Sequence, residues 1–449
     1  MNKQKKLLGM LAALVLVSAV TVMVVRREET KEKIKNTPAT VLEWSDISAV
    51  SWTCDGSSYA FEKTDDTWVY PEDTAFPVDQ EKMEELLSQF EDLGAAFTIE
   101  DVEDYGQYGL EKPSCTITLT QGEETVTLEL GDYSKMDAQR YASLGDSNVY
   151  LLSHDPVEDF DIGLSDLIQQ DQVPAFAEVE AITLTGNQTD EFRKTQGQSL
   201  CREDEYFRDS DGGPLDTDLT ENYLKTLEKV SLTDYVTYKA TEEDLKNCYL
   251  DTPAQTVTVT YRPEEGEEAA TFTLHLGKAP DESEEKPGQA YARVGDSPIL
   301  YKISESQYEA LTACGYDDLR HQNLFTGDFS LAKELTVTLE GSTRVFTYEE
   351  QDNEEPAWYL GEEQVDLTDI QTALENLTAE AFTQEAPTGK EELSLTVKLD
   401  QEGENTLTLT FYRQDGTTVL AQANGKSLCT LPRAQVVTLT ESFNAILLG

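Results

Sequence analysis

A Gly-Asp-Ser tripeptide occurs twice in this chain, and a histidine follows the second copy. The tripeptides are Gly145-Asp146-Ser147 and Gly295-Asp296-Ser297, and His321 lies downstream within Asp318-Leu319-Arg320-His321. A serine beside a general base and an orienting carboxylate is the arrangement of a serine hydrolase. In that chemistry Ser297 is the nucleophile, His321 its base, and Asp318 the group that orients the imidazole. A Ser/His esterase is the enzymatic hypothesis that the sequence offers.

The surroundings of both tripeptides favour a structural interpretation. Each lies between two short alternating segments, where Gly-Asp-Ser is ordinary turn chemistry. The first copy has no histidine near Asp166. The strand-then-helix context and the separate Gly and Asn oxyanion blocks of the lipase/esterase family with this signature are not apparent. We therefore predict two turns, no catalytic residues and no enzymatic activity.

The histidines and cysteines do not show metal-ligand spacing. His154, His275 and His321 stand in unrelated settings, and alternation predicts His275 on the solvated face of a strand. The chain has no CxxC motif, and its six cysteines allow fifteen full disulfide pairings, among which the sequence does not choose. The cysteines are Cys54, Cys115, Cys201, Cys248, Cys314 and Cys429. We predict no metal site and leave disulfides and buried free thiols open.

One acidic loop carries oxygen ligands suited to calcium. It runs over Asp209-Ser210-Asp211-Gly212-Gly213, with Asp216 and Asp218 beyond. Gly213 and Pro214 depart from the EF-hand register. We predict a solvated loop, with weak calcium binding as the alternative. The chain has no Walker or dinucleotide glycine motif, so no cofactor is predicted and it is not expected to be an ATPase.

The elements that position these residues are repeated three times along the chain. The clearest mark of the repeat is Tyr141-Ala142-Ser143-Leu144-Gly145-Asp146-Ser147, which returns as Tyr291-Ala292-Arg293-Val294-Gly295-Asp296-Ser297. We predict a first module over 45–173, a second over 174–326 and a divergent third over 327–449. Each is long enough to bury a core of its own.

Each module is predicted to contain one amphipathic helix. In the first module Val78-Asp79 is followed by apolar residues at helical spacing, and Leu215-Asp216 and Val365-Asp366 begin the same pattern in the other two. The aspartate is expected to cap the helix. Trp68 and Trp358 occupy matching places before the first and third helices, which favours a structural role.

A meander of four alternating strands is predicted after each helix. The predicted strands are 115–120, 125–130, 140–144 and 148–152 in the first module; 255–261, 271–276, 290–294 and 299–303 in the second; and 393–399, 405–412, 417–421 and 428–431 in the third. A short helix closes each module. The predicted fold class is α+β: a curved antiparallel sheet with a packed helix, in three tandem copies behind one N-terminal transmembrane helix.

The N-terminal region is predicted to anchor the chain in a membrane. Residues 7–25 are an uncharged apolar run close to the roughly 20 residues that a membrane-spanning helix needs. Lysines in residues 1–6 favour a cytoplasmic N-terminus, with the bulk of the chain extracytoplasmic at the cell membrane. Residues 26–44 are predicted to be a tether. A cleaved signal peptide is the alternative.

The net charge of the chain limits the classes of partner that it is expected to bind. With 34 Lys+Arg against 87 Asp+Glu, the formal net charge is −53. Such a surface repels phosphate backbones, so nucleic acid is excluded as a partner. It is compatible with cations or with a basic protein.

The motifs resemble the bacterial family called domain of unknown function 4340. The resemblance is carried by the Leu-x-x-Pro element Tyr108-Gly109-Leu110-Glu111-Lys112-Pro113, then Leu130-Gly131 and Tyr141-Ala142, and in the second module by Pro253 and Leu276-Gly277. The third module departs from it, with Leu409-Thr410 in place of Leu-Gly. The resemblance implies a membrane-anchored extracytoplasmic protein associated with an ABC-type transport system, of a kind similar to gliding-motility exporters, and it brings no catalytic residues.

We therefore expect an extracytoplasmic binding or scaffold protein, accessory to an ABC-type transport system, with a permease or another envelope protein as its partner. An independent cell-envelope adhesin or ligand-binding protein, assisted by calcium, is the alternative. The Ser/His esterase comes third.

Overall fold

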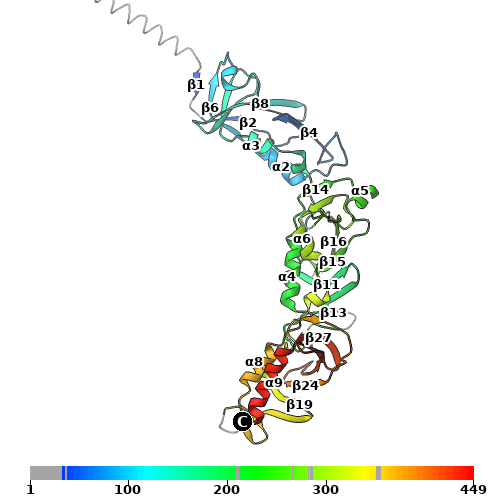
Figure 1. Ribbon diagram of the computed structural model, residues 1–449. Coiled ribbons are helices and arrows are strands. Elements are labelled where there is room, and N and C mark those ends of the chain that lie inside the picture. The colour runs from blue at the N-terminus through cyan, green and yellow to red at the C-terminus, as the bar shows by residue number, and fades with distance from the viewer. Residues whose placement is uncertain are drawn as a thin grey trace, which may run out of the picture. The chain divides into compact units, whose positions relative to one another are not determined.

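The computed structural model describes most of the chain after residue 32 (Figure 1). The described residues are 33–35, 38–195, 197, 199–208, 212–264, 267–281, 283, 287–349 and 355–448. They form two compact units, Met1–Gln170 and Asp171–Gly449. The first predicted module falls in the first unit, and the second and third modules share the second unit.

The first module is built on one antiparallel sheet. Its strands are β1 (Lys33–Lys35), β2 (Ala39–Leu42), β3 (Ala49–Cys54), β4 (Ser57–Thr64), β5 (Thr67–Val69), β6 (Leu93–Glu100), β7 (Cys115–Gln121), β8 (Glu124–Ser134), β9 (Gln139–Ser143) and β10 (Val149–Leu152). Its helices are α2 (Gln80–Ser88), α3 (Val157–Phe160) and two 3-10 turns, Gly106–Tyr108 and Leu164–Leu167. The strand order is β1-β6-β10-β9-β8-β7-β3-β4-β5, with β2 also on β6. Strands β1 and β2 lie within the segment predicted to be a tether.

The second module repeats this order. Its strands are β11 (Glu178–Thr185), β12 (Thr189–Lys194), β13 (Tyr206–Arg208), β14 (Asp234–Thr237), β15 (Gln255–Arg262), β16 (Ala270–Lys278), β17 (Ala290–Val294) and β18 (Leu300–Ile303). Its helices are α4 (Thr217–Glu228), α5 (Glu242–Asn247), α6 (Glu305–Thr312) and α7 (Tyr316–Leu319). The order is β13-β12-β11-β15-β16-β17-β18-β14, and α4 packs beside α6.

The third module repeats the order again. Its strands are β19 (Ala332–Leu339), β20 (Ser342–Glu349), β21 (Ala357–Leu360), β22 (Glu363–Val365), β23 (Ala381–Phe382), β24 (Glu391–Leu399), β25 (Thr406–Arg413), β26 (Thr418–Ala423) and β27 (Lys426–Pro432). A 3-10 turn (Phe329–Leu331) precedes them, and the helices are α8 (Thr368–Glu375) and α9 (Arg433–Leu448). The order is β22-β21-β20-β19-β24-β25-β26-β27-β23, and α8 and α9 lie side by side (Figure 1).

The predicted fold class was wrong in its balance of helix and strand and in its transmembrane helix. The described chain forms three antiparallel sheets with few helices, of which the longest, α9, has 16 residues. Among these residues no helix is both long and apolar enough to cross a membrane. Segments 1–6 and 7–25 lie outside the described residues. The prediction of a transmembrane helix rested on hydropathy, which measures transfer into lipid and not helix formation. The prediction of three sheet modules agrees with the three sheets.

The predicted amphipathic helix is present in all three modules. Asp79 accepts a hydrogen bond from the backbone of Lys82 at 3.0 Å, and Asp216 accepts one from Leu219 at 3.2 Å, so both cap their helices as predicted. In the third module Leu367 is the N-cap, and Asp366 instead accepts from the backbone of Thr368. The apolar stripe of each helix is buried: Met83, Leu87 and Phe90; Thr220, Leu224 and Leu227; Ile370, Leu374 and Leu377.

The Leu-Gly and Leu-x-x-Pro motifs meet in space, which explains the glycine. A Cβ atom added at Gly131 would lie 2.2 Å from the carbonyl oxygen of Tyr108, and one added at Gly277 would lie 2.3 Å from that of Tyr249. In both modules the backbone that leads into the proline therefore crosses directly over the strand. A glycine inside a strand often marks such an approach. Thr410 stands at this position in the third module, where the Leu-x-x-Pro element is replaced.

One disulfide joins two neighbouring strands of the first sheet. Cys54 at the end of β3 lies opposite Cys115 at the start of β7, and their Cα atoms are 4.2 Å apart. Cys201, Cys248, Cys314 and Cys429 are free thiols. The sequence left this pairing open because each cysteine sits in ordinary strand alternation.

We predict that Gly131→Ala lowers the free energy of unfolding of the first module by about 1–3 kcal/mol, because the added methyl overlaps the Tyr108 backbone. Tryptophan fluorescence during denaturation reports this module, which holds Trp44, Trp52 and Trp68 of the four tryptophans. Gly94→Ala is the matched control in β6, since its Cβ would make only ordinary contacts, the nearest at 3.5 Å. Equal losses in the two variants would contradict the prediction.

We predict that dithiothreitol lowers the melting temperature of the first module. The disulfide closes a separation of 61 residues, and removing such a link typically costs about 2–4 kcal/mol. A Cys54→Ala/Cys115→Ala variant should melt lower than the native chain without reductant and should not respond to reductant. An unchanged melting temperature of the native chain in dithiothreitol would refute this.

Candidate functional site

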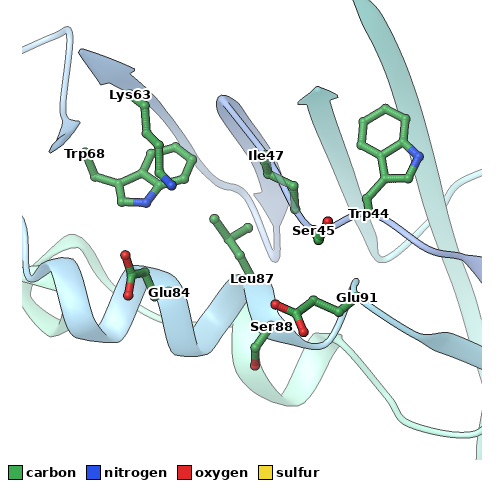
Figure 2. Close-up of a pocket in the computed structure, with 9 residues that line it drawn as sticks. All are labelled: Trp44, Ser45, Ile47, Lys63, Trp68, Glu84, Leu87, Ser88 and Glu91. Atoms are coloured by element: carbon green, nitrogen blue, oxygen red, sulfur yellow. The ribbon is translucent and has the colours of Figure 1, made fainter. Parts of the chain in front are cut away.

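A groove in the first module lies between the β4–β5 ribbon, helix α2 and the segment that leads into β3 (Figure 2). Its volume is about 190 Å³. It is lined by Trp44, Ser45, Ile47, Lys63, Trp68, Glu84, Leu87, Ser88 and Glu91. We call it the Trp68 groove. The ribbon supplies Lys63 and Trp68, α2 supplies Glu84, and Glu91 comes from the turn that follows α2.

Trp68 is held in place from its backbone and from its ring. The side chain of Gln80, the first residue of α2, accepts from the Trp68 backbone N–H at 2.7 Å and donates to its carbonyl oxygen at 3.0 Å. Lys63 lies directly across the ribbon from Trp68, with its ammonium 5.2 Å from the centre of the ring. These contacts fix the ribbon to the helix and give the groove a rigid wall.

The indole N–H of Trp68 is a buried donor that has no hydrogen-bond partner among the described residues. The residue is 2% exposed. Figure 2 shows the indole nitrogen on the ring edge that faces α2, the side on which Glu84 lies. A buried donor without a partner typically costs about 1–3 kcal/mol, and the indole N–H of Trp52 in the core is a second such donor among the described residues.

The charged side chains around the groove have opposite signs. Glu84 and Glu91 are exposed carboxylates on the helix side, and Lys63 lies on the ribbon side (Figure 2). Trp44 is half-buried, and its backbone N–H donates to the carbonyl oxygen of Phe90 at 2.8 Å. The groove therefore offers donors for a carbonyl group, carboxylates for a basic group and an aromatic surface. These are features for binding an extended peptide.

The third module also has a groove beside its ribbon, at the start of α8. Its volume is about 210 Å³, and its lining residues are Phe329, Ser330, Ala332, Tyr348, Trp358, Asp366, Leu367, Thr368 and Gln371. Trp358 again comes from the ribbon, with its ring centre 5.4 Å from that of Tyr348. The ammonium of Lys333 lies 4.8 Å from the Tyr348 ring. In both modules an aromatic residue of the ribbon and part of the helix line a groove, the later turns of α2 in the first module and the start of α8 in the third.

Strand register identifies the equivalent pair in each module. Lys63 lies opposite Trp68, Lys194 opposite Tyr206, and Tyr348 opposite Trp358. In the second module Lys194 also forms an ion pair with Glu205 at 2.7 Å. The sequence matched Trp68 to Trp358 correctly, but the unpartnered donor of Trp68 left no mark in the sequence.

The residues of the esterase hypothesis have other partners. The hydroxyl of Ser297 donates to Asp171 at 2.6 Å, and the carboxylate of Asp318 accepts from the Gly315 backbone at 2.9 Å. His321 contacts Asp204 at 2.6 Å through Nε2 and Asp216 at 3.3 Å through Nδ1. Ser297, His321 and Asp318 are therefore not joined to one another by any of these bonds.

Both Gly-Asp-Ser tripeptides are turns, as predicted. The first connects β9 to β10, with left-handed φ angles of 75° at Gly145 and 67° at Ser147. The second connects β17 to β18, with a φ of 45° at Gly295. Asp146 accepts hydrogen bonds from Tyr150 and Asn148 within its own hairpin.

The remaining histidines each have a partner within their own module. His154 pairs with Asp159 at 2.8 Å on the surface, beside α2. The ring of His275 contacts the hydroxyl of Thr256 at 3.0 Å, and burial lowers its pKa, so it is less solvated than predicted. Residues 209–211 of the proposed calcium loop lie outside the described residues.

One mixed cluster was missed by the sequence. Cys201, Asp204 and His321 bring potential ligand atoms within 4.8 Å of one another. Burial by itself would lower the pKa of His321, but the hydrogen bond that the ring donates to Asp204 and the charges of Asp204 and Asp216 outweigh it and raise the pKa. Asp204 and His321 are 117 residues apart in the chain, and no local spacing pattern relates them.

The molecule is a tandem array of antiparallel-sheet modules that carry aromatic grooves. The model of the family described as domain of unknown function (DUF4340) matches residues 68–251 and again residues 209–397. Because the matches together cover well over half of the chain, the protein belongs to this family. The second match begins 141 residues after the first (209 − 68), as expected for tandem modules. No curated protein and no solved structure matches the chain.

We predict that Trp68→Phe changes the free energy of unfolding by less than about 1.5 kcal/mol, whereas Trp68→Ala lowers it by about 3–5 kcal/mol. Phenylalanine keeps most of the ring contacts and removes the unpartnered N–H. Chemical denaturation followed by circular dichroism measures both variants. Equal losses would mean that the indole N–H has a partner within the folded chain.

Proposed function

We propose that this protein is a non-enzymatic binding and scaffold protein that acts outside the cytoplasm as an accessory to an ABC-type transport system. The observation that carries the binding role is the Trp68 groove, where a buried indole N–H has no partner among the described residues. Its partner is a short basic segment of another envelope protein. The first candidate for that protein is a transporter permease.

The Cys54–Cys115 disulfide supports a location outside the cytoplasm. Structural disulfides persist in oxidising compartments and are rare where thiols are kept reduced. The first module relies on this bond to join β3 to β7, so it is suited to the extracytoplasmic side of the envelope.

Charge supports a basic partner. The chain carries a net charge of −53, which raises the encounter rate with cationic surfaces. In the groove a lysine or arginine of the partner pairs with Glu84 and Glu91, the two carboxylates that line it.

The assignment to an ABC-type system is supported by family resemblance. The motifs Leu130-Gly131 and Leu276-Gly277, each crossed by a Leu-x-x-Pro backbone, are those by which the chain resembles proteins associated with such exporters. The assignment to an ABC-type system does not follow from the groove itself. The experiment that tests it identifies the partner directly.

Site-specific photo-crosslinking in intact cells tests both parts. A photoreactive residue replaces Ser88, which lines the groove on α2, and in a control chain replaces Met136, which is 92% exposed in the β8–β9 connection. We expect Ser88 to crosslink a permease of an ABC-type transporter, through a segment that contains lysine or arginine. Met136 should not crosslink it.

A charge-reversal variant is the second control. Glu84→Lys/Glu91→Lys should reduce the Ser88 adduct at least about tenfold, since it removes both carboxylates without touching buried residues. Equal adducts at Ser88 and Met136 would reject the groove as the binding site. A Ser88 adduct with a protein unrelated to transport would keep the groove and reject the ABC-type assignment in favour of an independent envelope binding protein.

A further inference from the structure

Three side chains with different donor atoms converge in the second compact unit. Cys201 and Asp204 come from the β12–β13 connection, and His321 follows α7. Their sulfur, oxygen and nitrogen atoms lie within 4.8 Å of one another. Asp204 is 1% exposed, His321 is largely buried and Cys201 is half-buried. Asp204 therefore holds its carboxylate in a nearly dry position, where it must be matched by a charge or by strong hydrogen bonds.

The three residues are held by a surrounding set of hydrogen bonds. Ser199 donates to Asp204 and also to the carbonyl oxygen of Cys201, the latter at 2.8 Å. His321 directs Nε2 at Asp204 and Nδ1 at Asp216, and Asp216 is itself fixed as the cap of α4. A histidine with a carboxylate on its second nitrogen is the usual arrangement of a metal ligand, because that bond fixes the ring orientation and the tautomer.

We propose that Cys201, Asp204 and His321 form a binding site for a divalent transition metal of the zinc class, with Asp216 orienting the histidine. Thiolate, imidazole and carboxylate together favour such an ion over calcium or magnesium, which take oxygen ligands. One thiolate, one carboxylate and a neutral imidazole with a doubly charged cation sum to zero charge. The site thereby neutralises the buried Asp204.

The change in geometry that binding requires is small. The Nε2 atom of His321 and the carboxylate of Asp204 are 2.6 Å apart with a hydrogen between them. In a tetrahedral site with bonds of about 2.0–2.2 Å the same two atoms are roughly 3.3 Å apart. The metal takes the place of that hydrogen, which leaves to solvent together with the proton of the Cys201 thiol, while the Nδ1 proton stays on the side of Asp216. A water completes four ligands.

The site lies where the second module meets the third. Leu200, next to Cys201, packs against the hydrophobic core of the third module, and its carbonyl oxygen accepts from Gln401 at 3.4 Å. Beside His321, Arg320 stacks on the ring of Phe382 at 3.9 Å. All three ligands belong to the second module, so a metal there orders the two segments through which that module contacts the third.

Cobalt binding to the full chain tests the site. The protein is treated with chelator, dialysed and titrated with Co²⁺, whose thiolate charge-transfer absorption reports a cysteine ligand. We expect one Co²⁺ per chain with this absorption, and a melting temperature that rises with Zn²⁺. Asp216→Asn should weaken affinity about 10–100-fold while keeping the helix cap, because asparagine caps as well as aspartate.

Two cysteine variants decide the outcome. Cys201→Ser should abolish the absorption and the Zn²⁺-dependent rise in melting temperature, whereas Cys314→Ser, which alters another half-buried free thiol, should keep both. Absence of the absorption in the native chain, or its persistence in Cys201→Ser, would overturn the proposal. Either result would leave His321 and Asp204 as a structural hydrogen-bonded pair.

Discussion

In each module one strand pairs with the ribbon along one edge and with the meander along the other, and the rest of the module depends on that pairing. β3 lies between β4 and β7, β11 between β12 and β15, and β19 between β20 and β24. The neighbours β4, β12 and β20 follow immediately in the chain. The neighbours β7, β15 and β24 come only after the ribbon and the helix. The pairing therefore brings together segments far apart in sequence and must overcome the entropy of closing that loop. In the first module the Cys54–Cys115 bond secures one end of it.

This arrangement also creates the Trp68 groove. The chain leaves the ribbon, forms α2 and returns to the opposite edge of the sheet as β6, beside β10. The helix consequently crosses below the ribbon, and Gln80 ties its first turn to the Trp68 backbone. Lys63 and the helix carboxylates then face a space that neither element fills (Figure 2). The groove follows from topology, while its chemistry follows from a few side chains.

The sequence predicts the meander strands and the helices well because each has a clear period. β17 begins and ends where alternation places it, and β7 extends only one residue beyond. Strands β6 and β23 were not predicted from the sequence, and each absence has a physical reason. β6 has no strict alternation in its burial, and β23 has two residues, too few for any period to register. The transmembrane helix was an error of another kind, drawn from hydropathy without support from any described helix.

The candidate sites were less predictable because they depend on proximity between distant residues. Trp68 was recognised as the counterpart of Trp358, yet only the fold reveals that its N–H is buried without a partner. Cys201 and His321 meet through the tertiary fold, so metal-ligand spacing could not reveal them. The Gly-Asp-Ser motif had the opposite property. It was conspicuous in sequence, and the surrounding strands explain it fully as turn chemistry.

The three modules keep one topology while their exposed chemistry diverges, which argues for distinct tasks. At the position opposite the ribbon aromatic, the first module has Lys63, the second has Lys194 in an ion pair with Glu205, and the third has Tyr348. A lysine already neutralised by a neighbour contributes little to recognition, whereas Lys63 borders a groove with an unused donor. The features on which the proposed binding rests are therefore concentrated in the first module, and the second instead supplies the Cys201–His321 cluster at its junction with the third.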